Sequence, residues 1–378
     1  MSGPTRDLDD PAALEAGDPA GMLRDIASSA AQVREGAVLA REAGVASLAD
    51  PGRPRAVVVC GMGGSGIAGD VLAAVAGAGS PVPVLTHRGY GLPGWVGVAD
   101  LVVAVSCSGS TEETLSALEE AVRRGVPVLV VGADGSPVHD LAQRGRGVFV
   151  PVPQGRQPRA SMWALATPLV VAGAALGICD GSEAAVEAAA VALEDVAQRC
   201  RVDADELVNP GKQLATHLLG AVPVLWGTSP LAGMAAYRFA CQLNENAKTP
   251  ATWGVLPEAN HNQVVAFDGP FAGGGPPSDD DLFRDREDDV DAGRLALVLL
   301  RDADEHPQTA RRADVSRHLA EERGIPVHVL SAEGDSPFER LARLVGTSDY
   351  ASTYLALAAG LDPTPVDAIT ELKTAISR

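Results

Sequence analysis

Short apolar runs that alternate with helix-compatible stretches constrain the fold of this chain more than any other feature of its sequence. In the first half of the chain the stretches 67–78 and 112–124 are compatible with helices, and they separate apolar runs at residues 56–60, 82–85, 101–105, 126–131 and 148–150. Apolar runs this short and continuous are typical of parallel strands that are buried on both faces. The alternation therefore predicts an α/β fold built on doubly wound parallel sheets.

The same alternation starts again in the second half of the chain. The expected elements are a helix at 185–200, strands at 222–227, 295–300 and 327–330, and helices at 230–243, 350–360 and 366–377. A chain of 378 residues also exceeds what one hydrophobic core usually holds. We therefore predict an N-terminal helical segment at 1–50, a first domain at 51–180 and a second domain at 181–378.

An acidic segment rich in Gly and Pro, residues 269–291, interrupts the second predicted domain. We interpret it as a solvated surface loop on the basis of its composition, with a lid or a partner-binding insertion as the alternative.

The charge of the chain limits the kinds of partner it can bind, and its cysteines indicate the cellular compartment. The chain has 49 acidic and 30 basic residues, and its formal net charge of -19 argues against binding to nucleic acid or to anionic membranes. Five scattered cysteines without a CxxC pair are typical of reduced thiols. The N-terminus is acidic where a secretory signal would be basic and then apolar, and no apolar run reaches membrane-spanning length. We expect a cytoplasmic protein.

A glycine-rich turn follows the first predicted strand, from Gly61 to Gly66, and it matches the GxGxxG pattern of dinucleotide-binding domains. Such domains carry an acidic residue about 20 residues further on, at the end of the second strand. Here that strand ends in Thr86, His87 and Arg88, without a carboxylate. Arg88 leaves open a phosphorylated nicotinamide cofactor, but the pattern disfavours any dinucleotide, and we expect no cofactor.

Hydroxyl groups gather at the end of the third predicted strand, at Ser106, Ser108, Ser110 and Thr111, just before a helix that begins at Glu112. Backbone amides at a helix N-terminus and nearby hydroxyls form a site for an anion such as a phosphate monoester. Ordinary helix capping is the alternative, but it needs only one hydroxyl. Parallel strands bring Gly64 and Ser65 of the glycine-rich turn to the same sheet edge. We predict that Gly64, Ser65, Ser106, Ser108 and Thr111 bind a phosphate.

Taken together, these two turns resemble the sugar isomerase (SIS) domain. Four further motifs follow in order along the chain: residues 158–160 (Pro-Arg-Ala), 244–248 (Asn-Glu-Asn-Ala-Lys), 260–262 (Asn-His-Asn) and 371–373 (Glu-Leu-Lys). The ordered set resembles the bifunctional phosphoglucose/phosphomannose isomerase family. This resemblance implies two SIS domains, a homodimer, and an enzyme that interconverts glucose 6-phosphate and mannose 6-phosphate with fructose 6-phosphate.

The chemistry of such an isomerase suits the residues in these motifs. A proton moves between C2 and C1 through a cis-enediol, which requires a base on one face of the sugar, and Glu245 is the candidate. The hexose ring must first open, and an imidazole such as His261 suits that proton transfer. By resemblance, Arg159 stabilises the intermediate and Lys373 assists ring opening. The alternatives are a surface Glu at a helix end, a structural His and a solvated Lys.

The enediol route runs on acids and bases alone, and the histidines and cysteines show no metal-ligand spacing, so we expect no metal. Two departures from the family pattern, at residues 161–167 and 362–366, leave the preference between glucose and mannose epimers open. A non-catalytic sugar-phosphate sensor is the main alternative, because SIS domains also serve as effector-binding modules. An amino-sugar isomerase is disfavoured, because the chain has no N-terminal cysteine nucleophile to release ammonia.

Overall fold

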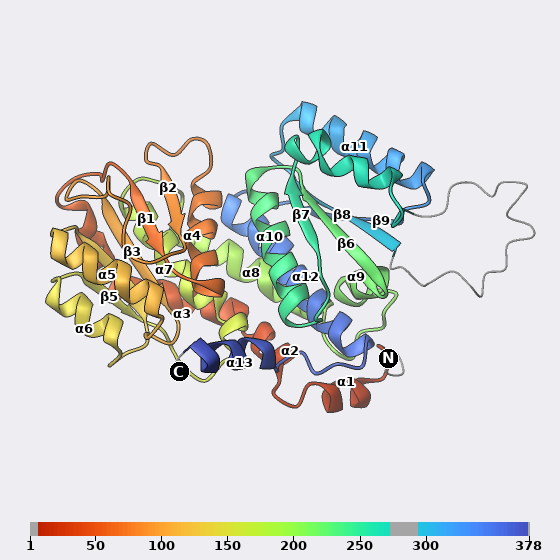
Figure 1. Cartoon of the computed structure of the whole chain (residues 1–378), viewed down its shortest axis with the longest axis horizontal. Coiled ribbons are helices and arrows are strands. Elements are labelled where there is room, and N and C mark those ends of the chain that lie inside the picture. The colour runs from red at the N-terminus through yellow and green to blue at the C-terminus, as the bar shows by residue number, and fades with distance from the viewer. Residues whose placement is uncertain (1–6, 273–293, 377–378) are drawn as a thin grey trace, which may run out of the picture. The chain divides into compact units, whose positions relative to one another are not determined.

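The computed structural model describes residues 7–272 and 294–376, and the chain divides into two compact units (Figure 1). Unit A comprises residues 27–195 and 334–343, and unit B comprises the described residues of 1–26, 196–333 and 344–378. Most of the predicted insertion at 269–291 lies outside the described residues. The domain boundaries that we drew at residues 50 and 180 remain a prediction.

Unit A is built on a five-stranded sheet in the order β2-β1-β3-β4-β5, and every neighbouring pair is parallel. Its strands are β1 (Val57–Cys60), β2 (Val84–His87), β3 (Leu101–Ser106), β4 (Val128–Gly132) and β5 (Val148–Pro151). Each strand overlaps one of the predicted apolar runs. The parallel α/β sheet expected for this half of the chain is therefore confirmed.

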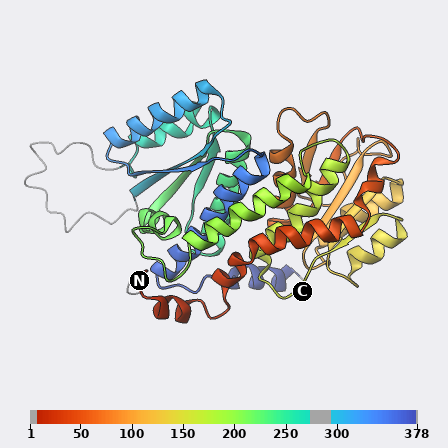
Figure 2. The same cartoon turned by 180° about the vertical axis from the view of Figure 1, so that it is seen from behind.

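Helices cover both faces of the sheet of unit A (Figures 1 and 2). Alternate residues of its central strands point to opposite faces, so that Val58 and Val102 pack with α5 and α6, while Val57 and Val103 face α4 and α7. Helix α7 is apolar on all sides and almost wholly buried, because α3 and α4 pack against it. The helices with most of their residues in this unit are α3 (Ser29–Glu42), α4 (Gly63–Ala76), α5 (Glu112–Arg124), α6 (Pro137–Arg144), α7 (Met162–Ala175) and α8 (Glu183–Arg199), with short 3-10 turns η1 (Val45–Ala49) and η2 (Pro158–Ala160).

Unit B contains a four-stranded parallel sheet in the order β7-β6-β8-β9. Its strands are β6 (Ala221–Gly227), β7 (Thr252–Val255), β8 (Arg294–Asp302) and β9 (Val327–Ala332). Helix α11 lies over one face and α10 and α12 lie over the other (Figures 1 and 2). The helices of this unit are α1 (Pro11–Gly17), α2 (Met22–Ala27), α9 (Pro210–Leu218), α10 (Pro230–Glu245), α11 (Pro307–Glu322), α12 (Pro337–Ala358) and α13 (Asp367–Ile376), with 3-10 turns η3 (Glu258–His261) and η4 (Gln263–Asp268).

Several elements of unit B differ from the sequence-based expectation. Strand β7 and helices α9 and α11 were not predicted. Helix α10 extends to Glu245, so this residue ends the helix instead of following it. Helix α12 begins at Pro337, well before the predicted start at residue 350, because its earlier turns are amphipathic and do not form an apolar run.

Two histidines of unit B form a pair that makes its stability depend on pH. The rings of His217 on α9 and His328 on β9 lie 5.4 Å apart, centroid to centroid. Burial, together with the neighbouring His217, lowers the pKa of His328 to about 4, and burial also lowers the pKa of His217. Below pH 6.5 the unfolded chain therefore binds protons that the folded chain does not, so folded-state stability is lost as the pH falls toward 4.

We expect the free energy of unfolding to fall by about 1 to 2 kcal/mol between pH 7 and pH 5 through His328 alone. Urea unfolding at the two pH values measures this loss, and His328→Gln should remove it. His318→Gln is the matched control, because His318 lies on the surface of α11 beside Glu322. An equal pH dependence in wild type and His328→Gln would contradict the assignment.

Candidate active site

The glycine-rich turn between β1 and α4 is forced into its shape by close backbone contacts. A Cβ atom at Gly61 would lie 2.9 Å from the carbonyl carbon of Ser65, and one at Gly66 would lie 2.7 Å from the carbonyl oxygen of Gly61. Gly63 has a positive φ of 51°. The glycines therefore bring the start of α4 tightly against the end of β1. Gly64 keeps open space around it, because its nearest neighbour would be the Pro158 carbonyl oxygen at 3.9 Å.

The hydroxyl-rich turn follows β3, which pairs in parallel with β1. Both turns therefore lie at the carboxyl ends of these neighbouring strands (Figure 1). The backbone amide of Cys107 donates to Ser65 Oγ at 3.2 Å and joins the two turns directly. Within the second turn, Ser106 Oγ and Thr111 Oγ1 lie 3.0 Å apart. The Ser110 amide donates to Ser108 Oγ at 3.3 Å. The structure thus brings all five predicted phosphate-binding residues together in unit A.

Helix capping does not explain these hydroxyls. Thr111 occupies the N-cap position of α5, but its side chain makes no capping hydrogen bond. Ser106 is buried, Thr111 is half-buried and Ser108 is exposed, so the group runs from the sheet edge to the surface. Hydroxyls that are not used for capping, next to backbone amides at a helix N-terminus, can bind an anion.

Arg159 lies in a segment that is folded against the two turns. Its helical turn η2 begins at Pro158, which is the nearest neighbour of Gly64, and the Gln154 side chain donates to the Cys107 carbonyl oxygen at 3.3 Å. Burial raises the pKa of the Cys107 thiol, and a hydrogen bond with Ser161 opposes that shift. Arg159 itself is buried. Residues 154–161 therefore hold the backbone of Arg159 next to a residue that contacts the glycine-rich turn.

Gln32 positions this segment, and sequence reasoning did not find it. The fully buried Gln32 side chain donates to the Ala160 carbonyl oxygen at 2.7 Å and accepts from the Ala164 amide at 3.3 Å. Its partners lie 128 and 132 residues away along the chain. No local pattern marks Gln32, because its role exists only once α3 packs against α7.

The equivalent turn of unit B is already filled by the protein itself. Ser229 Oγ accepts from the Ala232 amide at 3.1 Å as the N-cap of α10, and it donates to Asp302 Oδ2 at 2.7 Å. The Asp302 amide in turn donates to Thr228 Oγ1 at 3.2 Å. The buried Asp302 carboxylate, which is 4% exposed, thus takes up the hydroxyl at the start of α10. Of the two turns, only that of unit A is suited to a phosphate.

This contrast yields a prediction for two single hydroxyl variants. Thr111→Val should raise KM for a phosphorylated hexose about tenfold or more, because it removes a bond to a charged ligand. It should cost less than about 1 kcal/mol of stability, because it removes the contact with Ser106 Oγ but no cap. Ser229→Ala should do the opposite: it should cost about 1 kcal/mol of stability through the lost cap and leave KM unchanged. Kinetics and thermal unfolding of both variants test this. A higher KM in Ser229→Ala alone would place the phosphate in unit B.

Glu245 is half-buried and ends α10, whose inner face carries a polar seam toward α12. The seam consists of Arg238, Asp349, Asn246 and Ser352. Arg238 Nε and Nη2 each contact the Asp349 carboxylate at 3.1 Å. The next residue after Glu245, the fully buried Asn246, donates through Nδ2 to Ser352 Oγ at 2.9 Å. The seam fixes the end of α10 and with it the backbone of Glu245.

Lys248 closes the same helix end. Its ammonium group donates to the carbonyl oxygens of Glu245 at 3.1 Å, Asn246 at 3.0 Å and Asp362 at 3.1 Å. The residue has a positive φ of 54°, as residues that terminate helices often do. The lysine of the Asn-Glu-Asn-Ala-Lys motif is therefore structural, a role that the sequence did not reveal.

His261 is exposed at the end of η3, and the two asparagines beside it hold this turn in place. Asn260 Nδ2 donates to Ser316 Oγ on α11 at 2.8 Å, and Asn262 Nδ2 donates to Glu258 Oε1 at 2.9 Å. The Asn-His-Asn motif thus fixes the turn and leaves the imidazole accessible.

Lys373 is exposed in the last turn of α13, a helix without a buried residue. Glu245, His261 and Lys373 all belong to unit B, whereas Arg159 and the phosphate-binding candidates belong to unit A.

Among residues 7–272 and 294–376, no three His, Cys, Asp or Glu side chains gather as possible metal ligands. None of the described helices is long and apolar enough to cross a membrane.

Comparison with known proteins shows that the chain is similar to sugar-phosphate isomerases. Residues 207–376 match the family described as the bacterial phospho-glucose isomerase C-terminal SIS domain. A bifunctional phosphoglucose/phosphomannose isomerase of Caldicellulosiruptor bescii is 30% identical over 321 residues, which cover 85% of this chain and 89% of the relative. One of Aquifex aeolicus is 30% identical over 325 residues, covering 86% and 91%.

A solved structure shares the fold. A hypothetical protein from Thermus thermophilus superimposes with a TM-score of 0.69 at 16% identity, covering 95% of this chain and 90% of that chain. At this identity the likeness shows the fold alone. Together with the family match, it confirms the predicted α/β fold of SIS type.

Proposed function

The chain belongs to the bifunctional phosphoglucose/phosphomannose isomerase family, and on that premise we propose that it interconverts glucose 6-phosphate and mannose 6-phosphate with fructose 6-phosphate. The observation that carries the proposal is the pair of joined turns in unit A, with hydroxyls that are not used for capping and a buried arginine in the segment folded against them. This arrangement supports a phosphate monoester as the anchoring group of the substrate.

In the proposed mechanism, Gly64, Ser65, Ser106, Ser108 and Thr111 bind the phosphate. His261 and Lys373 transfer protons between the ring oxygen and the C1 hydroxyl, so that the hexose opens. Glu245 then removes the proton from C2 and returns it to C1, or the reverse, through a cis-enediol. Arg159 stabilises the negative charge that develops on the enediol oxygens.

Formation of both epimeric aldoses, glucose 6-phosphate and mannose 6-phosphate, depends on the face of C2 to which the proton returns. Delivery to either face requires that the planar intermediate can rotate above Glu245. We propose that this freedom exists here, so that both aldoses form. We also propose that the enzyme acts as a homodimer in the cytoplasm.

A coupled assay of the purified wild-type enzyme, with a chelator present, tests the proposal. Fructose 6-phosphate is supplied, and glucose 6-phosphate and mannose 6-phosphate are scored separately. We expect both products. One product alone would narrow the specificity, and neither product with sugar-phosphate binding intact would identify a sensor instead of an enzyme.

A further inference from the structure

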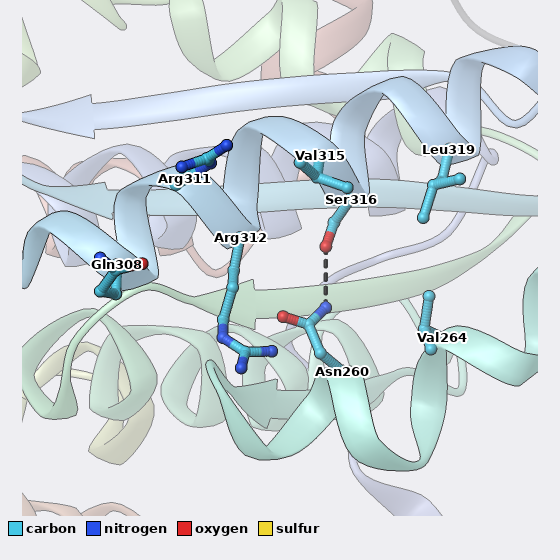
Figure 3. Close-up of a pocket in the computed structure, with 8 residues that line it drawn as sticks. All are labelled: Asn260, Val264, Gln308, Arg311, Arg312, Val315, Ser316 and Leu319. Carbon is cyan, nitrogen blue, oxygen red and sulfur yellow. Dashed lines mark hydrogen bonds between the residues drawn. The ribbon is translucent and has the colours of Figure 1, made fainter.

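A cavity lies within unit B, and none of its lining residues is assigned above to substrate binding or catalysis. It has a volume of about 360 Å³, which is within the range of small-molecule sites, and it opens between α11 and the turns η3 and η4 (Figure 3). Its lining residues are Asn260, Val264, Gln308, Arg311, Arg312, Val315, Ser316 and Leu319. Polar and apolar groups therefore share one small space.

Two adjacent arginines give the cavity a positive charge. Arg311 and Arg312 make no ion pair or hydrogen bond with any residue in the described part of the chain, whereas Arg317, further along the same helix, contacts Glu321 at 3.8 Å. Arg312 extends from α11 toward the segment of Asn260 (Figure 3). In a chain with 49 acidic and 30 basic residues, two neighbouring guanidinium groups without an ion pair to a described residue favour an anionic ligand.

Asn260 offers a second polar contact at the same place. Its Nδ2 atom donates to Ser316, but its buried Oδ1 atom has no donor among the residues that the structure describes. A buried polar atom without a partner is costly, and a hydroxyl of a ligand would supply the missing donor after a small opening of the turn. Val264, Val315 and Leu319 supply apolar surface for a short carbon chain.

We propose that this cavity binds a small organic anion of the phosphorylated hydroxy-acid class. The arginines bind its phosphate and carboxylate groups, and Asn260 accepts from its hydroxyl. Because Asn260 directly precedes His261, a ligand that contacts Asn260 acts on the turn that carries the imidazole. This coupling, unlike the binding itself, rests on the proposed function.

Isothermal titration calorimetry with 3-phosphoglycerate as the probe tests the binding. The titration uses the full chain carrying Ser65→Ala and Thr111→Val, in which the phosphate turn of unit A is disabled. We expect one site per chain, and adding Arg312→Ala should weaken it at least about tenfold, because a charge-assisted contact is lost. Glycerol 3-phosphate, which lacks the carboxylate, should bind more weakly than 3-phosphoglycerate.

Arg317→Ala is the matched control on the same helix, and it should leave the affinity within about twofold. Arg312 is exposed, so its removal should not unfold the chain, and thermal unfolding checks this. No saturable binding, or equal affinity with and without Arg312, would overturn the proposal. The wild-type product assay is independent of this result, so failure of the proposed function is distinguished from failure of the site.

The coupling is tested by turnover of fructose 6-phosphate at a 3-phosphoglycerate concentration that saturates the wild-type cavity but not that of Arg312→Ala. We expect kcat to change at least about twofold in wild type and not in Arg312→Ala. Binding that leaves kcat unchanged would overturn the link to His261.

Discussion

Glu245→Gln is expected to lower kcat for fructose 6-phosphate by about 10²- to 10⁴-fold and to leave KM within about threefold of wild type. The amide keeps the size of the side chain but cannot accept the C2 proton. Because the backbone of residue 245 is fixed through Asn246 and Lys248, the substitution should not disturb the helix end. Steady-state kinetics and exchange of the C2 proton with solvent deuterium measure the effect.

A control with the same chemical change is available on α11. Glu321→Gln alters a surface carboxylate that contacts Arg317, and it should leave kcat unchanged. Exchange of the C2 proton at the wild-type rate in Glu245→Gln would reassign Glu245 to a structural role. Loss of substrate binding in place of turnover would lead to the same reassignment.

His261→Ala should separate ring opening from proton transfer. We expect it to reduce overall turnover of the cyclic substrate more than that of an open-chain substrate, since the latter does not need the ring-opening step. Equal losses on both would place His261 in the enediol step instead.

The sequence predicted the strands well where their environment is uniformly apolar. Strands β1 and β3 are buried along their whole length, and a buried strand reads as a continuous apolar run. Strand β7 is an edge strand whose first residues, Thr252 and Trp253, are exposed, so it carries no such run. The sequence pattern therefore did not indicate strand β7.

The candidate site was predictable in its residue types but not in its supporting contacts. Both Thr111 and Ser229 precede a helix after a parallel strand, and in sequence the two look alike. The structure distinguishes them, because Ser229 caps its helix and bonds Asp302, whereas Thr111 does neither. Gln32 shows the same limit, since its contacts depend on packing between distant helices.

Asp349→Ala is expected to destabilise the protein by about 3 to 5 kcal/mol, the largest effect on stability that we predict. The Arg238–Asp349 pair is 1% and 3% exposed, so removing the carboxylate leaves a buried guanidinium group without its counter-charge. Burial raises the pKa of the Asp349 carboxyl even beside Arg238. Urea unfolding of wild type and variant measures the loss.

The double variant Arg238→Met/Asp349→Leu separates stability from positioning. Replacing both charges by apolar groups should restore most of the lost stability, because no unpaired charge remains. If the pair also positions Glu245 through α10, the double variant should fold but keep a lower kcat at an unchanged KM.

The surface pair of Arg343 and Asp195, 3.2 Å apart, provides the control, since Asp195→Ala should cost less than about 1 kcal/mol. Equal losses in Asp349→Ala and Asp195→Ala would contradict the buried-charge argument, and a wild-type kcat in the double variant would show that the seam stabilises α10 without positioning the base.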